Sequence, residues 1–143
     1  MDTEQIEIVV QPIPAEDYLR LVVDVGWKRF VNPEAVETAL ANSTWSAVAV
    51  DREKDDFVVG AVRVVGDGAI FFYIQDLMVM KAYRKRGIGR ALMEAANDYL
   101  KQETPRKSYV GLFTHPTKTA FYEKFGFNGP RPSLVGMYKT TKT

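Results

Sequence analysis

Residue types that form disulfides, nucleophilic sites and metal sites are absent or nearly absent from this sequence. It contains no cysteine, so disulfides, thiolate nucleophiles and cysteine-ligated zinc are all excluded. The single histidine, His115, excludes a metal site built from several histidines, and we expect no metal. Neither sign of charge dominates, because 19 basic and 18 acidic side chains leave a net charge of +1. Nucleic-acid-binding proteins usually have a large basic excess, so we expect no nucleic acid among the partners.

Long apolar segments are lacking as well. The longest mostly apolar run, 69–80, is interrupted by Gln75 and Asp76 and is shorter than the about 20 residues that span a bilayer. The first residues have neither the basic start nor the apolar core of a signal peptide. We therefore expect no membrane partner and a cytoplasmic location. A length of 143 residues with 46% hydrophobic side chains suits one globular domain, which we expect over residues 1–143.

The order of expected elements indicates an α/β fold with a mixed sheet, β-α-α-β-β-β-α-β-α-β. Hydrophobic periodicity and turn residues predict strands over 6–11, 45–50, 57–65, 69–80 and 108–114. Helices are expected over 14–25, 33–41, 87–102 and 116–125. A last strand after Phe127 would be interrupted by Pro130 and Pro132. The run 69–80 scarcely alternates, so we expect both faces of that strand to be buried.

A basic turn that contains glycine lies between this long strand and the longest expected helix. In residues 81–90, KAYRKRGIGR, five of the ten side chains are cationic and none is acidic. Glycine lets a backbone approach a ligand closely, and the free N–H groups of a helix N-terminus favour an anion. The turn therefore indicates a pyrophosphate site, with a solvated basic turn as the alternative. A P-loop sequence is absent, and Leu92 stands where a dinucleotide fingerprint has its third glycine.

Two motifs resemble those of the GNAT superfamily of N-acetyltransferases. The pattern R-x-x-G-x-G over residues 84–89 matches the family's [QR]-x-x-G-x-[GA] signature, and the LMV stretch 77–79 stands in the usual place before it. Further on, residues 120–127, AFYEKFGF, closely resemble the second motif, whose core is F-Y-x-x-x-G-F. The two motifs occur in the right order, separated by a helix and a strand. The resemblance covers 69–127 well, and the first half of the chain is compatible in element order only.

The resemblance implies an acetyl-CoA site. The pantetheine arm is expected beside Leu77, Met78 and Val79, with the N–H of Val79 donating to the thioester oxygen. The remaining expected contacts are those of the pyrophosphate turn and one residue of the second motif: Arg84, Lys85, Arg86, Gly87, Ile88, Gly89, Arg90 and Phe121. The chain departs from the family where Lys81 replaces a frequent proline and where Thr114-His115 replaces a frequent asparagine. The second departure leaves the pantetheine contacts of that region open.

Acetyl transfer to an amine sets three chemical requirements. An alkyl ammonium with a pKa of about 10 must lose its proton, the oxyanion needs a hydrogen-bond donor, and the departing thiolate needs a proton. The resemblance places Tyr122 as the general acid, with water as an alternative. It places the base at Gln75 or Tyr73, neither of which is strongly basic at neutral pH. Asp76 is ionisable, but strand alternation points it away from Gln75 unless a bulge intervenes, so a water wire stays open.

We therefore expect an acetyl-CoA-dependent N-acetyltransferase that acts on a primary amine of a small molecule. The aromatic content of the strand 69–80 favours an arylalkylamine-like acceptor, with an amino sugar or a polyamine as alternatives. A protein N-terminus or a lysine side chain is also open as the acceptor. A non-catalytic acyl-CoA-binding or sensor module is the second hypothesis, and a nucleotide-binding domain is the third. The expected partners are acetyl-CoA and a small amine, and a homodimer stays open.

Overall fold

The computed structural model describes residues 5–103, 107–129 and 132–141. Its strands are β1 Ile6–Val10, β2 Trp45–Asp51, β3 Phe57–Gly66, β4 Phe71–Val79 and β5 Tyr109–Gly111. Its helices are α1 Ala15–Asp24, α2 Val36–Ala41, α3 Ile88–Glu103 and α4 Thr119–Glu123. Short 3-10 turns precede α2 at Pro33–Ala35 (η2) and follow β4 at Lys81–Tyr83 (η4). This is the expected α/β order, except that the described residues after Phe127 form no regular strand.

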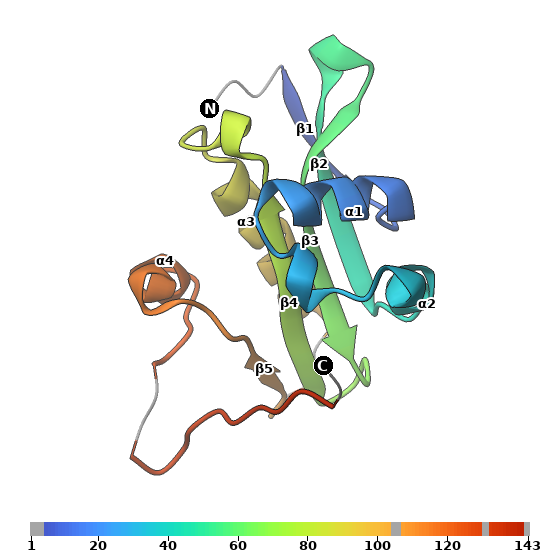
Figure 1. Cartoon of the computed structure of the whole chain (residues 1–143). Helices are drawn as coiled ribbons and strands as arrows, with labels where there is room; N and C mark the ends of the chain where they lie inside the picture. Colours follow the sequence, from blue (N-terminus) through green and yellow to red (C-terminus); the bar gives the residue numbers. More distant parts are fainter. Residues whose placement is uncertain (1–4, 104–106, 130–131, 142–143) are drawn as a thin grey trace. The chain divides into compact units, whose positions relative to one another are not determined.

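The strands form one mixed sheet in the order β1-β2-β3-β4-β5 (Figure 1). The first four are antiparallel neighbours, whereas β5 lies parallel to β4, a pairing that needs a crossover connection, which α3 supplies. By its contacts the chain divides into two compact units, Met1–Leu112 and Phe113–Thr143. The first unit holds the sheet and α1 to α3, and the second holds α4. The expectation of one domain over the whole chain stays a prediction.

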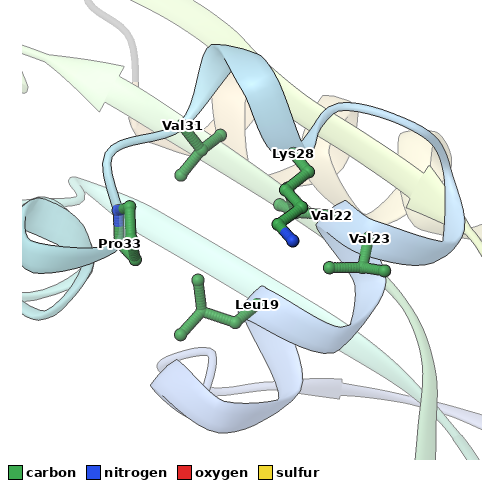
Figure 2. Close-up of a pocket in the computed structure, with 6 residues that line it drawn as sticks. All are labelled: Leu19, Val22, Val23, Lys28, Val31 and Pro33. Carbon is green, nitrogen blue, oxygen red and sulfur yellow. The ribbon is translucent and has the colours of Figure 1, made fainter.

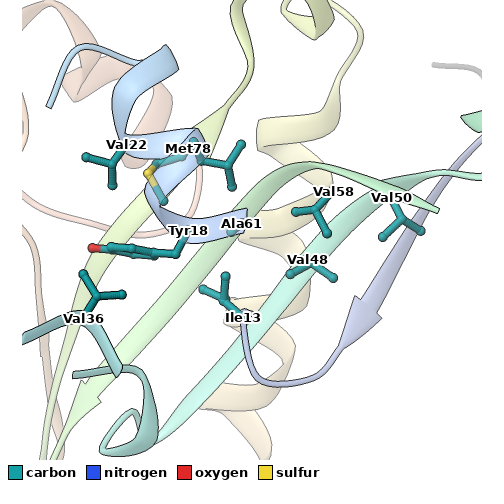
Figure 3. Close-up of a cluster of buried hydrophobic side chains, with 10 residues drawn as sticks. Ile13, Tyr18, Val22, Val36, Val48, Val50, Val58, Ala61 and Met78 are labelled. Atoms are coloured by element: carbon teal, nitrogen blue, oxygen red, sulfur yellow. The ribbon is translucent and has the colours of Figure 1, made fainter. Parts of the chain in front are cut away.

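Helices cover both faces of the sheet in the first unit (Figure 1). On one face, α1 and α2 pack on β2, β3 and β4 through a cluster that includes Tyr18, Val22, Val36 and Met78 (Figure 3). On the other face, α3 buries Ile88, Leu92 and further apolar side chains at helical spacing, as the sequence predicts. No helix of the described residues is both long enough and apolar enough to cross a bilayer.

The expectation that both faces of β4 are buried is confirmed only in part. Phe72, Ile74, Asp76 and Met78 are buried, whereas Phe71 is 57% exposed and Gln75 is exposed. Phe71 stacks instead on Tyr109 of the neighbouring strand, with 6.2 Å between ring centroids. The apolar run therefore did not predict the exposure of Phe71. An aromatic side chain at a strand end can pack on its cross-strand neighbour while one side of its ring faces solvent.

A close approach of β3 and β4 depends on a glycine. A Cβ built on Gly60 would lie 2.9 Å from the carbonyl oxygen of Met78 and 3.2 Å from a methyl group of Leu92. The first of these atoms belongs to the backbone of the strand that carries the expected pantetheine contacts, so it cannot move freely. Gly60 thus sets how closely β4 lies against β3 and α3.

We predict that Gly60→Ala lowers the free energy of unfolding by about 1–3 kcal/mol, the usual cost of over-packing a tight site. Gly89→Ala is the matched control, because a Cβ there meets only a methyl group of Val79 at 3.7 Å. The control should be neutral or stabilising by up to about 1 kcal/mol. Urea denaturation of both variants measures the difference, and equal stabilities would contradict the steric argument.

Candidate active site

Strand β4 has a free edge at its C-terminal half. Its pairing with β5 ends at Tyr73↔Gly111, so the stretch 74–79 pairs with β3 alone among the described residues. The N–H of Met80 donates to the carbonyl of Val59 at 2.9 Å, on the β3 side. Because successive N–H groups of a strand point to alternate edges, the N–H of Val79 points to the free edge. A backbone donor is therefore available where the sequence predicts one for the thioester oxygen.

A row of unpaired backbone donors follows directly after this strand. The turn from η4 into α3 leaves the N–H groups of residues 85–90 without a hydrogen bond to any described residue, and the helical ladder begins with Ala91 donating to Gly87. Lys85 and Gly87 both have positive φ, 64° and 79°. Left-handed residues turn successive N–H groups toward one side and create an anion-binding concavity. The helix dipole adds to the preference for an anion.

The cations of the turn do not all point into this concavity. Arg86 donates to Gln5 at 2.8 Å and Arg90 pairs with Glu94 one turn further along α3. Arg84 and Lys85 are exposed and form no ion pair with a described residue. The expectation that the whole basic segment wraps a pyrophosphate stays a prediction, for which the backbone donors, Arg84 and Lys85 have no competing ion pair among the described residues.

A buried hydrogen bond anchors the turn to the far end of β2. The hydroxyl of Tyr83 donates to Asp51 Oδ2 at 2.6 Å, and the Gln5 amide donates to the same oxygen at 3.2 Å. The bond to Tyr83 lowers the pKa of Asp51, and the same bond raises the pKa of Tyr83. Arg86 lies over the Tyr83 ring, 5.1 Å from its centroid. The aromatic residue before the signature therefore holds the turn in place.

A bulge in β4 places two polar side chains on one face. Arg63 pairs with Asp76 and Val64 with Ile74, so Gln75 is the extra residue. Asp76 therefore faces α1, on the same side of the sheet as Gln75. The bulge interrupts the alternation that would otherwise place the two side chains on opposite faces.

The carboxylate of Asp76 is committed to two partners. One of its oxygens accepts from the Arg63 Nε and from the Tyr18 hydroxyl, each at 2.9 Å, and the residue is 2% exposed. Burial and the charge of Asp76 raise the pKa of Tyr18 to about 12, so this phenol stays protonated. Asp76 is therefore placed to position Tyr18 and Arg63, and a catalytic role for it stays a prediction.

Two cavities lie between α1, α2 and the segment that joins them. The first, about 140 Å³, is lined by apolar side chains and Lys28 (Figure 2). The second, about 210 Å³, is lined by Tyr18, Asn32, Arg63 and Gln75 together with apolar residues of α2 and the preceding loop. Only the second reaches β4 and contains a residue expected at the site, so it is the better candidate for an acceptor pocket.

The second motif has a clear structural basis within the C-terminal unit. Gly126 adopts φ 92°, its N–H donates to Glu123, and the N–H of Phe127 donates to Tyr122. These two bonds form a Schellman motif, which ends a helix with a left-handed residue. The rings of Tyr122 and Phe127 make the apolar contact that accompanies it, 6.2 Å between centroids. F-Y-x-x-x-G-F therefore encodes a helix end that fixes the Tyr122 ring.

The other candidates of this unit are placed as follows. Phe121 packs edge-on against Tyr122 and at a tilt against Phe125, and it is half-buried. Burial raises the pKa of Tyr122, and a hydrogen bond with Thr114 opposes that shift. His115 accepts from the N–H of Thr117 and caps the short turn at Pro116–Lys118. A capping role explains His115 without chemistry.

Sequence reasoning missed Tyr18, Arg63 and Asp51. Arg63 had a visible signal, because it is the one charged residue in the otherwise apolar run FVVGAVRVVG. A cation at the centre of a strand needs a buried partner. Tyr18 had no such signal, because an aromatic residue at helical spacing is typical of a hydrophobic core.

Comparisons with known proteins show the family of this chain. The family model described as acetyltransferase (GNAT) domain matches residues 14–135. A protein of unknown function and probable acetyltransferase from meticillin-resistant Staphylococcus aureus is 30% identical with a TM-score of 0.85, covering 95% of this chain and 99% of that one. A GNAT-family acetyltransferase from Streptococcus pneumoniae is 35% identical with a TM-score of 0.75, covering 96% and 99%.

A curated relative is longer than this chain. An uncharacterized N-acetyltransferase from Gracilaria tenuistipitata var. liui is 27% identical over 124 residues, which make up 85% of this chain and 66% of that protein. The chain thus spans slightly less than two thirds of that relative. The family model nevertheless covers most of the chain, and both sequence motifs and the free edge of β4 fall inside the matched range. This chain belongs to the GNAT acetyltransferase family.

Proposed function

We propose that this protein transfers the acetyl group of acetyl-CoA to a primary amine of a small molecule. One observation carries the proposal: the free edge of β4 ends directly in a row of unpaired N–H groups, within one compact unit. The strand edge is suited to the amide-rich pantetheine arm, because an extended ligand can pair with it as a further strand. The concave turn at residues 85–90 is suited to the pyrophosphate.

The proposed reaction is direct attack of the neutral amine on the thioester carbonyl carbon. A C–N bond forms, the C–S bond breaks, and the proton lost from nitrogen balances the proton gained by sulfur. The N–H of Val79 would donate to the carbonyl oxygen as negative charge develops there, a role that preorganised backbone donors perform well. Tyr73 and Gln75 would hold the water molecules that carry the amine proton away, since neither side chain is a strong base.

Tyr122 is the proposed donor to the departing sulfur. A phenol is protonated at neutral pH, and burial raises the pKa of Tyr122 further, so a proton is present when the thiolate forms, although the phenol is a weaker acid than a free one. The Schellman motif at Gly126 restricts the ring, which reduces the entropy lost on binding. Asp76 is proposed as a positioning residue, because both of its hydrogen-bond partners line the larger cavity.

A screen of amines against acetyl-CoA tests the function. Release of the free CoA thiol should depend on one class of amine and be accompanied by the acetylated product. If acetyl-CoA binds but no small amine, peptide N-terminus or lysine peptide is acetylated, the non-catalytic sensor is the better description. Acetylation of peptides alone would favour a protein acceptor. Sedimentation of the same sample would report whether the chain forms the homodimer that the sequence leaves open.

The proposed pyrophosphate site at residues 85–90 leads to a prediction about added charge. Gly89→Glu should weaken CoA binding by about tenfold or more, because a carboxylate would face the pyrophosphate. Gly89→Gln adds the same bulk without charge, and Gly89→Ala fits the fold as described above. Calorimetry should rank the affinities as alanine, then glutamine, then glutamate. Equal affinity of the folded glutamate variant and the wild type would place the phosphates elsewhere.

The hydroxyl of Tyr122 generates a kinetic prediction. Tyr122→Phe keeps the ring that packs on Phe127 and removes only the donor. We expect kcat to fall about 100-fold while CoA affinity stays nearly unchanged, because the donor matters only as charge develops on sulfur. Phe121→Leu is a packing control that leaves the hydroxyl. An equal loss of binding and rate in the Tyr122 variant would identify a packing residue.

A further inference from the structure

The 210 Å³ cavity beside β4 contains an unusual cation. Arg63 is 8% exposed, yet its guanidinium lines this cavity. Its Nε donates to Asp76, and its Nη1 lies 3.5 Å from the Ala39 carbonyl and 3.4 Å from the Ser43 hydroxyl, both at the long limit of a hydrogen bond. The guanidinium also forms a hydrogen bond with the Tyr18 hydroxyl, so its five N–H groups have at most four described partners, Asp76, Ala39, Ser43 and Tyr18. A desolvated guanidinium thus keeps donor capacity on the side of the cavity.

The rest of the cavity wall offers donors and no negative charge. No acidic residue is among those that line it, and Asp76 is not part of the wall. Tyr18 stays protonated at neutral pH because its pKa is about 12. The side-chain amides of Asn32 and Gln75 supply further N–H groups, and the Asn32 oxygen is already occupied by the N–H of Glu34. A cationic group such as the far end of a polyamine would find no carboxylate here.

The geometry points to an acceptor that carries both an amine and a carboxylate. The cavity binds its carboxylate through the guanidinium of Arg63 and the amides of Asn32 and Gln75. This inference rests on the proposed function and names its substrate class. An arginine fork suits a planar carboxylate because it presents parallel N–H groups. The recognised class is then amino acids and related amino carboxylates rather than arylalkylamines or polyamines.

The contribution of net charge is small, because Asp76 balances Arg63. Selectivity should come from the directed donors. A ligand that lacks the carboxylate would leave a partly buried guanidinium N–H without a partner. A neutral amide in place of the carboxylate would accept fewer hydrogen bonds and place an NH₂ group against these donors. We therefore expect a difference of about tenfold between a carboxylate and its amide.

Direct removal of Arg63 is a poor test, since it would strand the buried carboxylate of Asp76 and could unfold the protein. Ala39→Glu leaves the pair intact and adds a carboxylate to the cavity wall, at an exposed position of α2. Ala41→Glu is the matched control, because it adds the same charge to an exposed position of the same helix outside the wall. Comparison with this control separates the local effect of the carboxylate in the wall from the long-range effect of one added charge.

The probes are N-acetylated amino acids and their C-terminal amides, in pairs that differ only in the carboxylate, with glycine, alanine, leucine and phenylalanine side chains. Binding to the CoA-saturated wild type is measured by calorimetry. We expect at least one pair in which the carboxylate binds about tenfold tighter than the amide. In Ala39→Glu that ratio should fall to about one with amide affinity retained, and in Ala41→Glu it should persist.

Turnover separates this inference from the proposed function. Phenylalanine should be acetylated with a higher kcat/KM than either phenylalaninamide or phenethylamine. Acetylation of phenethylamine or a polyamine in preference to every amino acid would overturn the carboxylate inference and leave the acetyltransferase proposal standing. Equal binding of carboxylate and amide in every pair, or a preference that Ala41→Glu abolishes as fully as Ala39→Glu, would overturn it as well. A carboxylate preference in binding without turnover of any amine would contradict the proposed function alone.

Discussion

The rest of the site depends on one constraint, which is that β4 keeps its partner on one side and loses it on the other. Pairing with β3 runs to Val79, while pairing with β5 stops at Tyr73. Backbone polar groups strongly favour a hydrogen-bond partner, so the released edge is available to an extended ligand. The turn of unpaired N–H groups follows immediately, because the chain leaves the sheet at Met80 and enters α3 eight residues later.

Two buried carboxylates hold this arrangement, one at the turn that follows β4 and one within the strand. Asp51 fixes the basic turn through Tyr83, and Asp76 fixes Tyr18 and Arg63 beside the larger cavity. Burying a charge is costly unless hydrogen bonds satisfy it, and each carboxylate has more than one donor. Such networks specify geometry more than they add stability. Their effect here is to fix the turn after β4 and one wall of the larger cavity.

The second motif illustrates how a family pattern can have two physical meanings. Gly126 is required by a left-handed helix end, and Phe127 is required by the apolar contact with Tyr122. Both would be needed even if Tyr122 had no chemical role. The hydroxyl is the part of the motif that helix termination does not explain. The catalytic assignment therefore rests on that one atom.

The sequence alone determined the class of fold, the strand and helix order up to Phe127 and the place of the basic turn, because these follow from local signals: periodicity, glycine and a run of cations over residues 81–90. It did not determine that Arg86 donates to Gln5 or that Asp76 joins Gln75 on one face. These features depend on a bulge and on residues such as Tyr18 and Gln5 that are distant in sequence. Only tertiary packing brings such partners together, and one inserted residue reverses which face every later side chain occupies.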